Sequence, residues 1–332
     1  MLLCCGLFLS LAVCAQPDNE TTPYTKAKSF MQQQDYSNAV LVLQACLEKE
    51  PDNLQYGKDL ALCYFFKKDI KKAEQTIEPI LDRNDADDQC YQIAGFIYKE
   101  KESLKDCERM YRKGIKRFPS SGALYNDLGE LLWAQQDYSA IKQWEKGIET
   151  DPAFSRNYFN ASKYYYFTTD KVWSILYGEI FLNIEPSGTA TPEIKNILFE
   201  GYKKLFAEAD LTKANDGKNE FVTAFLQTMN KQSMLAAGGI NTESLVMIRS
   251  RFILDWFNDY GSKFPFRLFD QQRQLLQDGL FDAYNQWIFT ASQNLPAYQN
   301  WITANAPDYN EFTRFQKGRI FKMPAGQYYH PQ

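Results

Sequence analysis

Four small residues at a constant spacing of 34 positions constrain this chain most: Ala27, Ala61, Gly95 and Gly129. Two helices can pack closely only where the side chains between them are small. A second small residue follows each of the four about twelve positions later, at Ala39, Ala73, Cys107 and Ala140. Apolar residues three and four positions away complete a buried stripe on each helix. The pattern therefore predicts repeated pairs of helices that cross at these small residues.

The residues between and after the predicted helices fit the same unit. A polar residue followed by an aromatic or aliphatic one marks the turn inside each pair, at Asp35-Tyr36, Asp69-Ile70 and Asp137-Tyr138. Proline cannot continue a helix and disfavours helical backbone in the residue before it. It closes four of the units, at Pro51, Pro119, Pro152 and Pro186.

Residues 20–186 resemble the tetratricopeptide repeat family, whose period is 34 residues and whose marks are small residues, a tyrosine and a closing proline. Four repeats span about 20–53, 54–87, 88–121 and 122–152, and the fourth is one residue short between Tyr138 and Ala140. A fifth, at about 154–186, has Ala161, Tyr164 and Pro186, but Trp173-Ser174 replaces its second small residue. The resemblance implies an all-α fold, a right-handed solenoid of helical hairpins.

The second half of the chain, 187–332, shows no strand-like alternation and is expected to be a further all-helical region. Helices are expected over about 192–209, 221–237, 242–260 and 271–292, followed by shorter ones. The segment from Met323 onward is expected to be frayed. Two arrangements stay open: degenerate hairpins that continue the solenoid, or a separate helical cap.

A six-residue pattern occurs twice in this half, and we call this internal repeat the aromatic echo. The first copy is Ala283-Tyr284-Asn285-Gln286-Trp287-Ile288, and the second, fourteen residues later, is Ala297-Tyr298-Gln299-Asn300-Trp301-Ile302. Two interpretations follow. The aromatic and amide side chains could form surfaces that stack on a glycan or another small ligand. Alternatively, two similar amphipathic helices bury their Tyr and Trp in one core, because these residues bury large areas while their polar tips find partners. The second interpretation is the simpler one.

The first fifteen residues, 1–15, are apolar and uncharged, and too short to span a bilayer. They resemble a secretory signal peptide that is cleaved after Val13-Cys14-Ala15, although no Lys or Arg precedes the apolar run. In a rival interpretation Cys14 is the lipid-modified residue of a bacterial lipoprotein signal. We therefore expect an exported chain, periplasmic or secreted, or else lipid-anchored at the outer membrane or cell envelope. No transmembrane segment is expected after it.

Composition and motifs point away from several function classes. The net charge is −4, and no basic stripe suggests a nucleic-acid partner. The one histidine, His330, leaves no Cys-His pair or Ser-His-Asp triad nearby in the sequence. Gly217-Lys218 lacks the other residues of a phosphate loop. Acidic pairs such as Asp87-Asp88 are typical of solvated faces. We expect no enzyme, no cofactor and no metal.

Four cysteines follow the leader: Cys46, Cys63, Cys90 and Cys107. If neighbouring helices pack as in the tetratricopeptide repeat family, Cys46 and Cys63 are offset by about 10 Å along the helix axis. That offset is beyond the reach of a disulfide. The four are expected to be free thiols that behave as small buried apolar residues.

The resemblance also implies a concave groove lined by the first helix of each repeat. Its positions here are mostly aromatic or amide, and exposed aromatic residues in a groove are typical of binding surfaces. We expect an exported scaffold that binds a peptide or protein segment there; the alternative function is capture of a glycan or small ligand by the second half. The groove would be covered if that half folds back over it. The candidate groove residues are Tyr24, Lys58, Leu62, Phe65, Phe66, Gln92, Phe96, Asn126, Trp133, Tyr158, Tyr165 and Tyr166.

Overall fold

The computed structural model describes residues 22–213 and 215–330, and these residues form helices and connecting segments without a strand. The expected all-α fold is confirmed. The predicted signal peptide, with the candidate lipidation site Cys14, lies outside the described residues. The chain divides into two compact units, Met1–Ala86 and Asp87–Gln332, each treated by itself below. The expected boundary at 186/187 is therefore not where the structure divides.

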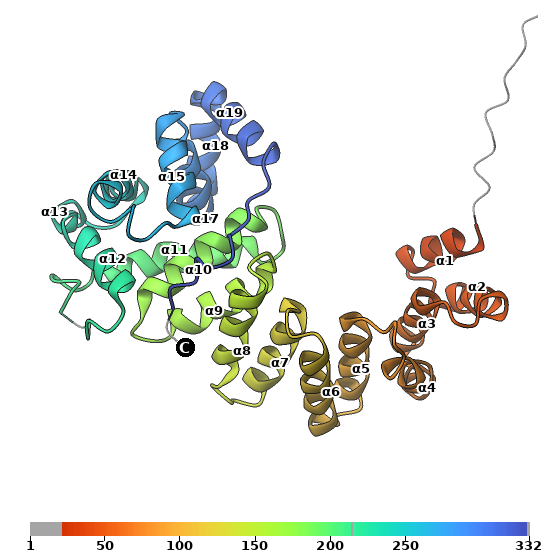
Figure 1. The fold of residues 1–332 in the computed structure, drawn as a ribbon. Coiled ribbons are helices and arrows are strands. Elements are labelled where there is room, and N and C mark those ends of the chain that lie inside the picture. The colour runs from red at the N-terminus through yellow and green to blue at the C-terminus, as the bar shows by residue number, and fades with distance from the viewer. Residues whose placement is uncertain (1–21, 214, 331–332) are drawn as a thin grey trace, which may run out of the picture. The chain divides into compact units, whose positions relative to one another are not determined.

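Two helical hairpins make up the described part of the first unit (Figure 1). The second unit opens with three more hairpins, which correspond to the third, fourth and fifth repeats. The helices of the first unit are α1 (Pro23–Gln32), α2 (Tyr36–Lys49), α3 (Leu54–Phe66) and α4 (Ile70–Leu81). The hairpins of the second unit are α5 (Asp88–Glu100) with α6 (Leu104–Arg117), α7 (Gly122–Ala134) with α8 (Ala140–Thr150), and α9 (Ser155–Tyr166) with α10 (Lys171–Ile184).

The turn inside each of the first four hairpins has one backbone form. In each turn, the residue before the turn aspartate has a left-handed backbone conformation; in the third hairpin Ser103 takes the place of the aspartate. The φ angle lies between 57° and 63° at these four residues, Gln34, Lys68, Glu102 and Gln136. The backbone N–H of the next residue donates a hydrogen bond to the carbonyl five residues earlier, from Asp35 to Phe30 and from Asp69 to Tyr64. This geometry satisfies carbonyls that the first helix would otherwise leave unpaired. Side chains of Asp35 and Asp69 then cap the second helix.

Small residues do lie at the crossings inside the hairpins. Ala27, Ala39, Ala61 and Ala73 have no exposed surface. A Cβ added to Gly95 would lie 2.2 Å from the Tyr111 ring, and one added to Gly129 would lie 2.3 Å from the Trp144 indole. Glycine is therefore required at these two positions because a large ring of the second helix fills the space. The four predicted thiols are free and buried.

The fifth hairpin crosses one residue later than the sequence indicated. Its small residues are Ser162 and Ser174, and each hydroxyl donates to the other residue's carbonyl, at 2.7 and 3.0 Å. The pair restores the twelve-residue interval of the earlier repeats. Because the fourth repeat is one residue short, the position equivalent to Gly129 is Ser162 and not Ala161. The register assigned to the fifth repeat from sequence was wrong by one residue.

The second half packs onto the hairpins of the second unit and shares that compact unit with them. α11 pairs with α10, α12 packs on α10, and η1 and α17 pack on α11, while α14, α15 and the last helices pack on these in turn (Figure 1). The helix expected over 271–292 is interrupted at Gly279, whose φ of +73° ends α15. The remaining elements are α11 (Thr191–Leu205), α12 (Glu220–Asn230), α13 (Ser233–Ala236), α14 (Thr242–Asp259), α15 (Arg267–Gln277), α16 (Phe281–Asn285), the π-helix η1 (Gln286–Thr290), α17 (Ala291–Gln293), α18 (Leu295–Ala304) and α19 (Ala306–Lys317).

The segment after α19 is not frayed, contrary to the expectation from sequence. We call residues 321–330 the strap. It leaves α19 and returns along the solenoid (dark blue in Figure 1), with Phe321 and Met323 buried. Tyr329 stacks on Phe221 with 4.5 Å between ring centroids. Burial of these apolar side chains offsets the entropy of ordering the segment. Among the described helices, none is long and apolar enough to cross a membrane.

Candidate functional site: aromatic surfaces on the first helices

The first unit exposes an aromatic group at the end of α3. Phe66 is 50% exposed and stacks on Tyr36, with 5.0 Å between ring centroids. Phe65 meets Phe66 edge to face at 5.4 Å, and the Lys68 ammonium lies 5.7 Å from the Phe65 ring centroid. Leu62, one turn earlier on the same helix, is half-buried. These residues form an apolar surface that is fixed by ring contacts and not by the core.

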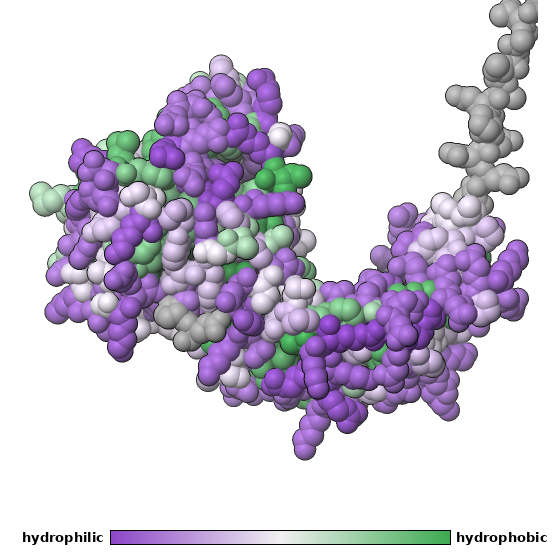
Figure 2. Space-filling view, in the orientation of Figure 1, coloured by the Kyte–Doolittle hydropathy of each residue, from purple (hydrophilic) through white to green (hydrophobic). Residues whose placement is uncertain are grey.

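The second unit exposes a separate aromatic group around Trp133 on α7. Trp133 is 40% exposed, and its ring lies 5.7 Å from Tyr138, 5.9 Å from Tyr164 and 6.1 Å from Trp144. Phe96, on α5, is 36% exposed. Figure 2 shows hydrophobic surface over the α5–α7 part of the molecule, bordered by hydrophilic surface. The continuity expected between Phe66 and Phe96 stays a prediction.

Three amide and hydroxyl candidates, Tyr24, Gln92 and Asn126, form hydrogen bonds between successive first helices. In the first unit, the Tyr24 hydroxyl donates to the Asp59 carboxylate at 2.8 Å. In the second unit, Gln92 donates to Asp127 at 2.7 Å, and Asn160 donates to the Asn126 carbonyl oxygen at 2.9 Å. Each bond connects a first-helix position of one repeat to the residue one place after the equivalent position in the next repeat. We call this set the inter-repeat ladder.

Burial in the ladder raises the pKa of Asp127 to about 6, although hydrogen bonds from Gln92 and Asn126 act in the opposite direction. The carboxyl group is desolvated, so its charged form is disfavoured. The ladder therefore fixes the first helices relative to one another and includes one acid whose charge depends on pH near neutrality.

Four of the predicted groove residues are buried, so their assignment to an open groove is corrected. They are Lys58, Asn126, Tyr158 and Tyr165. Tyr158 and Tyr165 were assigned to the groove because Ala161 was taken as the small residue at the crossing of the fifth hairpin. The crossing is at Ser162, so the groove positions of this repeat shift by one residue and no longer include these two tyrosines. They point instead into the core between the helices, where each ring lies against Tyr177 of α10.

Tyr166 takes a groove position in the corrected register. It is half-buried, and the Lys204 ammonium of α11 lies 3.5 Å from its ring centroid. Phe167, the neighbouring groove position that the sequence reading missed, is 72% exposed. Counting the missing residue of the fourth repeat would have found it.

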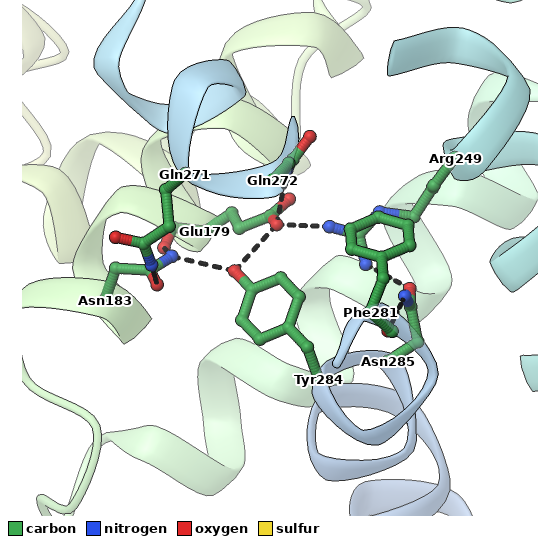
Figure 3. Close-up of polar contacts among 8 residues, drawn as sticks. All are labelled: Glu179, Asn183, Arg249, Gln271, Gln272, Phe281, Tyr284 and Asn285. Carbon is green, nitrogen blue, oxygen red and sulfur yellow. Dashed lines mark hydrogen bonds and ion pairs between the residues drawn. The ribbon is translucent and has the colours of Figure 1, made fainter. Parts of the chain in front are cut away.

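A buried polar cluster in the second unit was also missed (Figure 3). Glu179 of α10 forms an ion pair with Arg249 of α14, and both side chains are almost fully buried. The same carboxylate oxygen accepts from Gln272 at 2.6 Å and from Tyr284 at 2.8 Å. Arg249 also donates to the Asn285 carbonyl oxygen. The cluster connects α10, α14, α15 and α16 and holds the second half on the solenoid.

The sequence signal for this cluster is one charge inside an apolar helix. Glu179 is the only charged residue between Val172 and Ile184, and a buried charge must be paired. The partner could not be read from the sequence, because Arg249 lies 70 positions away.

The aromatic echo follows its simpler interpretation. Tyr284 and Tyr298 are buried, and the Tyr284 and Trp287 rings both lie about 6 Å from Phe312. Lys195 of α11 donates to the Trp287 carbonyl at 2.6 Å and lies 4.0 Å from its ring centroid. Burial lowers the pKa of Lys195 to about 7. These aromatics therefore form core contacts, including those around the π-helix.

No constellation for catalysis or metal binding is found among the described residues. They contain no group of three or more His, Cys, Asp or Glu side chains that could hold a metal ion. The acid with the largest upward shift toward neutrality is Glu145, whose pKa burial raises to about 7. Its neighbours are Tyr165 and His330 of the strap. Glu145, Asp127 and Lys195 lie on different helices, each within its own packing contacts.

One basic face contradicts the expectation that the chain has none. α6 exposes basic side chains one and two turns apart, with acidic side chains beside them. Arg109 pairs with Asp106, and Arg112 pairs with Glu108, both at 2.7 Å. The exclusion of nucleic acid therefore stays a prediction. The exposed basic residues of α6 are Lys105, Arg109, Arg112, Lys113 and Lys116.

Comparison with protein families finds one match. Residues 30–94 match the family model described as tetratricopeptide repeat. This stretch begins inside α1 and ends inside α5. None of the curated proteins compared matches the chain.

Several solved structures resemble parts of the chain at low identity. The crystal structure of MamA has a TM-score of 0.39 and 17% identity, and the match covers 47% of this chain and 92% of that one. YrrB, described as a TPR protein with an unusual peptide-binding site, has a TM-score of 0.36 and 15% identity, covering 52% and 90%. The human IFIT1 dimer with PPP-AAAA has a TM-score of 0.41 and 17% identity, covering 90% and 65%.

Proposed function

We propose that this chain, a tetratricopeptide repeat protein, is a non-enzymatic scaffold that binds an extended segment of another protein on its first helices. The observation that carries the proposal is the exposed aromatic group around Trp133 of α7, with Tyr138 in the turn before α8 and Tyr164 on α9. Soluble proteins rarely expose such rings together without a partner. Aromatic residues are also enriched among the side chains that dominate protein interfaces.

The inter-repeat ladder supports the same proposal. Gln92, Asp127 and Asn126 already satisfy one another, so the polar part of the first-helix face is fixed before a partner arrives. A fixed surface loses little conformational entropy on binding. The apolar rings then supply the affinity, and their spacing along α5 and α7 selects the segment. Phe65 and Phe66 supply a second such surface on the first unit.

Glycan capture by the second half has lost its support. It required the Tyr and Trp of the echo to face solvent, whereas Tyr284 and Tyr298 are buried. We retain a peptide or protein partner as the one proposed ligand class. Export also remains part of the proposal, with the chain periplasmic, secreted or lipid-anchored. Its support is the apolar leader of residues 1–15 and the cleavage pattern at Val13-Cys14-Ala15.

Export is tested by the intact mass of the protein purified from its native host. Cleavage by a signal peptidase predicts a chain that begins at Gln16. Lipidation predicts a chain that begins at Cys14 with the mass of attached acyl chains. A mature protein that retains Met1 contradicts both.

Peptide binding is tested by selecting peptides from a displayed random library on the purified protein. The selected peptide is then titrated against Trp133→Ala, with Lys142→Ala on the exposed side of α8 as the matched control. We expect Trp133→Ala to weaken binding at least tenfold, about 1.4 kcal/mol, and the control to leave it unchanged.

Circular dichroism accompanies both titrations, because Trp133 also contacts Trp144 in the core. Equal affinities for the wild type and a folded Trp133→Ala variant would remove the binding site from α7. Failure to select any peptide that binds the wild type would contradict the ligand class.

A further inference from the structure

The strap lies in the structure as a bound peptide does. Its residues from Met323 to Tyr328 line one small cavity together with Ile148 of α8 and Tyr158 of α9. It has no helix or strand of its own between Phe321 and His330. It nevertheless buries Phe321 and Met323. An irregular segment with buried anchors is held by side-chain contacts and not by its own backbone bonds.

Tyr329 and His330, which are adjacent in the strap, contact different elements of the second unit. Tyr329 faces the second half: its ring lies 4.5 Å from Phe221 and 5.7 Å from Phe264, and its hydroxyl donates to the Pro265 carbonyl at 2.7 Å. His330 faces the solenoid: it lies 5.1 Å from the Trp173 ring and pairs with Glu145 at 3.1 Å. The strap therefore occupies a groove with walls of different chemistry.

A backbone carbonyl and a side chain of the strap also accept hydrogen bonds. The Asn219 side-chain amide donates to the Tyr329 backbone carbonyl at 2.8 Å, and the Arg267 backbone N–H donates to the Gln327 side-chain oxygen at 2.6 Å. Asn219 also caps α12, so its position is fixed by the helix it begins. A donor aimed at a main-chain carbonyl recognises any extended polypeptide, whereas the ring pockets select tyrosine.

The solenoid wall of this groove is made by the two buried tyrosines that the sequence had assigned to the first-helix face. Tyr165 bonds both Glu145 of α8 and His330, and Tyr158 lies beneath the strap. The groove thus lies on the side of α9 that faces α8 and α10. It is distinct from the surface around Trp133.

We propose that this groove is a second peptide-binding site, specific for an extended segment with adjacent tyrosines, and that the strap is its ligand in cis. The site would take the same kind of segment in trans whenever the strap leaves. A tethered segment is present at an effective concentration in the millimolar range, so the strap excludes free peptides under ordinary conditions. This inference does not depend on the aromatic surface of the proposed function, because it involves other residues and another ligand.

The test weakens the strap within the full chain and supplies its sequence as a separate molecule. The probe is a fluorescent synthetic peptide of residues 321–330. We expect the wild type not to bind it and Tyr329→Ala to bind it, because that variant loses the stacking on Phe221 and the bond to Pro265. Tyr309→Ala, which removes a tyrosine of α19 outside the strap, should behave as the wild type. A probe peptide with Tyr329→Ala should bind neither protein.

A second measurement tests the proposal without the Tyr329→Ala substitution. A protease site is placed in the exposed stretch Gly318-Arg319-Ile320 of the full chain, and the strap is cut from α19 after folding. We expect native mass spectrometry to show the cut strap retained, then exchanged for excess labelled peptide, while the helical signal persists. The proposal is overturned if folded Tyr329→Ala and the cut protein both fail to take up the peptide. It is also overturned if loss of the strap unfolds the protein, because the strap would then be core and not ligand.

Discussion

Two glycines show how single residues determine the hairpin crossings. At Gly95 and Gly129 a ring from the second helix occupies the space that a side chain would need. The sequence predicted small residues at these positions but not the reason that glycine stands at two of them. The reason is Tyr111 and Trp144, whose placement depends on tertiary packing that a spacing pattern does not contain.

Gly95→Ala should therefore destabilise the second unit. The new Cβ would lie 2.2 Å from Tyr111, a buried ring that cannot move aside. Overpacking of this kind costs about 1–3 kcal/mol. Urea denaturation followed by circular dichroism measures the change. Gly238→Ala is the matched control, since no atom lies within 4 Å of the added Cβ and no destabilisation is expected there. A free energy of unfolding equal to that of the wild type would contradict the crossing.

Asp127 should make stability fall as pH rises. Burial raises its folded pKa to about 6 from the usual 3.8 of an aspartate, so between these pH values the folded state holds a proton that the unfolded state has released. Stability from this group is complete below about pH 4 and is lost as pH rises to about 6. Asp127→Asn should remove that part of the slope in melting temperature between pH 4 and pH 7. An unchanged slope would show that the carboxyl is not desolvated.

At the scale of helices, the first four hairpins were predictable because small residues, turn aspartates and closing prolines recur in register. The fifth was misplaced by one residue because Ala161 and Ser162 are both small and the missing residue of the fourth repeat was not counted. Counting it leads to Ser162, and the mutual bonds of Ser162 and Ser174 agree with that register. Two aromatic candidates, Tyr158 and Tyr165, were assigned wrongly for the same reason.

The packing of the second half could not be predicted at all from periodicity, because it depends on Glu179 and Arg249 meeting across 70 positions. Arg249→Met should cost about 3–5 kcal/mol, since it leaves the Glu179 charge buried without its partner. Adding Glu179→Leu should recover part of that loss. Arg273→Ala removes an exposed pair with Asp270 and should cost less than about 1 kcal/mol. Chemical denaturation of the four proteins measures these differences, and equal costs for Arg249 and Arg273 would contradict the role of the cluster.

For the whole molecule, the sequence predicted the class of fold and a solenoid followed by more helices. It did not predict that residues 187–330 join the hairpins after Ala86 in one compact unit, nor that the strap docks. Both depend on contacts between segments far apart in sequence, such as Tyr329 with Phe221. Of the candidate site, the exposed positions Phe66, Phe96 and Trp133 were identified correctly as exposed aromatics. Their role in binding is a proposal.

The proposal that the partner is a protein or peptide leads to a prediction about the whole molecule. With a net charge of −4, and with acids paired to Arg109 and Arg112 on the basic face of α6, the protein should not bind a single-stranded RNA oligonucleotide at physiological salt. Fluorescence anisotropy of a labelled oligonucleotide measures this binding. Binding that weakens steeply with salt and is lost in Lys113→Glu/Lys116→Glu would assign a nucleic-acid role to α6 and contradict the protein-only partner.

The central claim, that the first-helix face is where a protein partner binds, is tested most directly by site-specific photo-crosslinking in the native host. A photoreactive phenylalanine analogue replaces Phe96 on α5 or, as the matched control, Lys142 on the exposed side of α8. We predict a cross-link to one discrete protein from position 96, none from position 142, and loss of the first when Trp133→Ala is added. Cross-linking to the same protein from position 142 but not from position 96 would contradict the account.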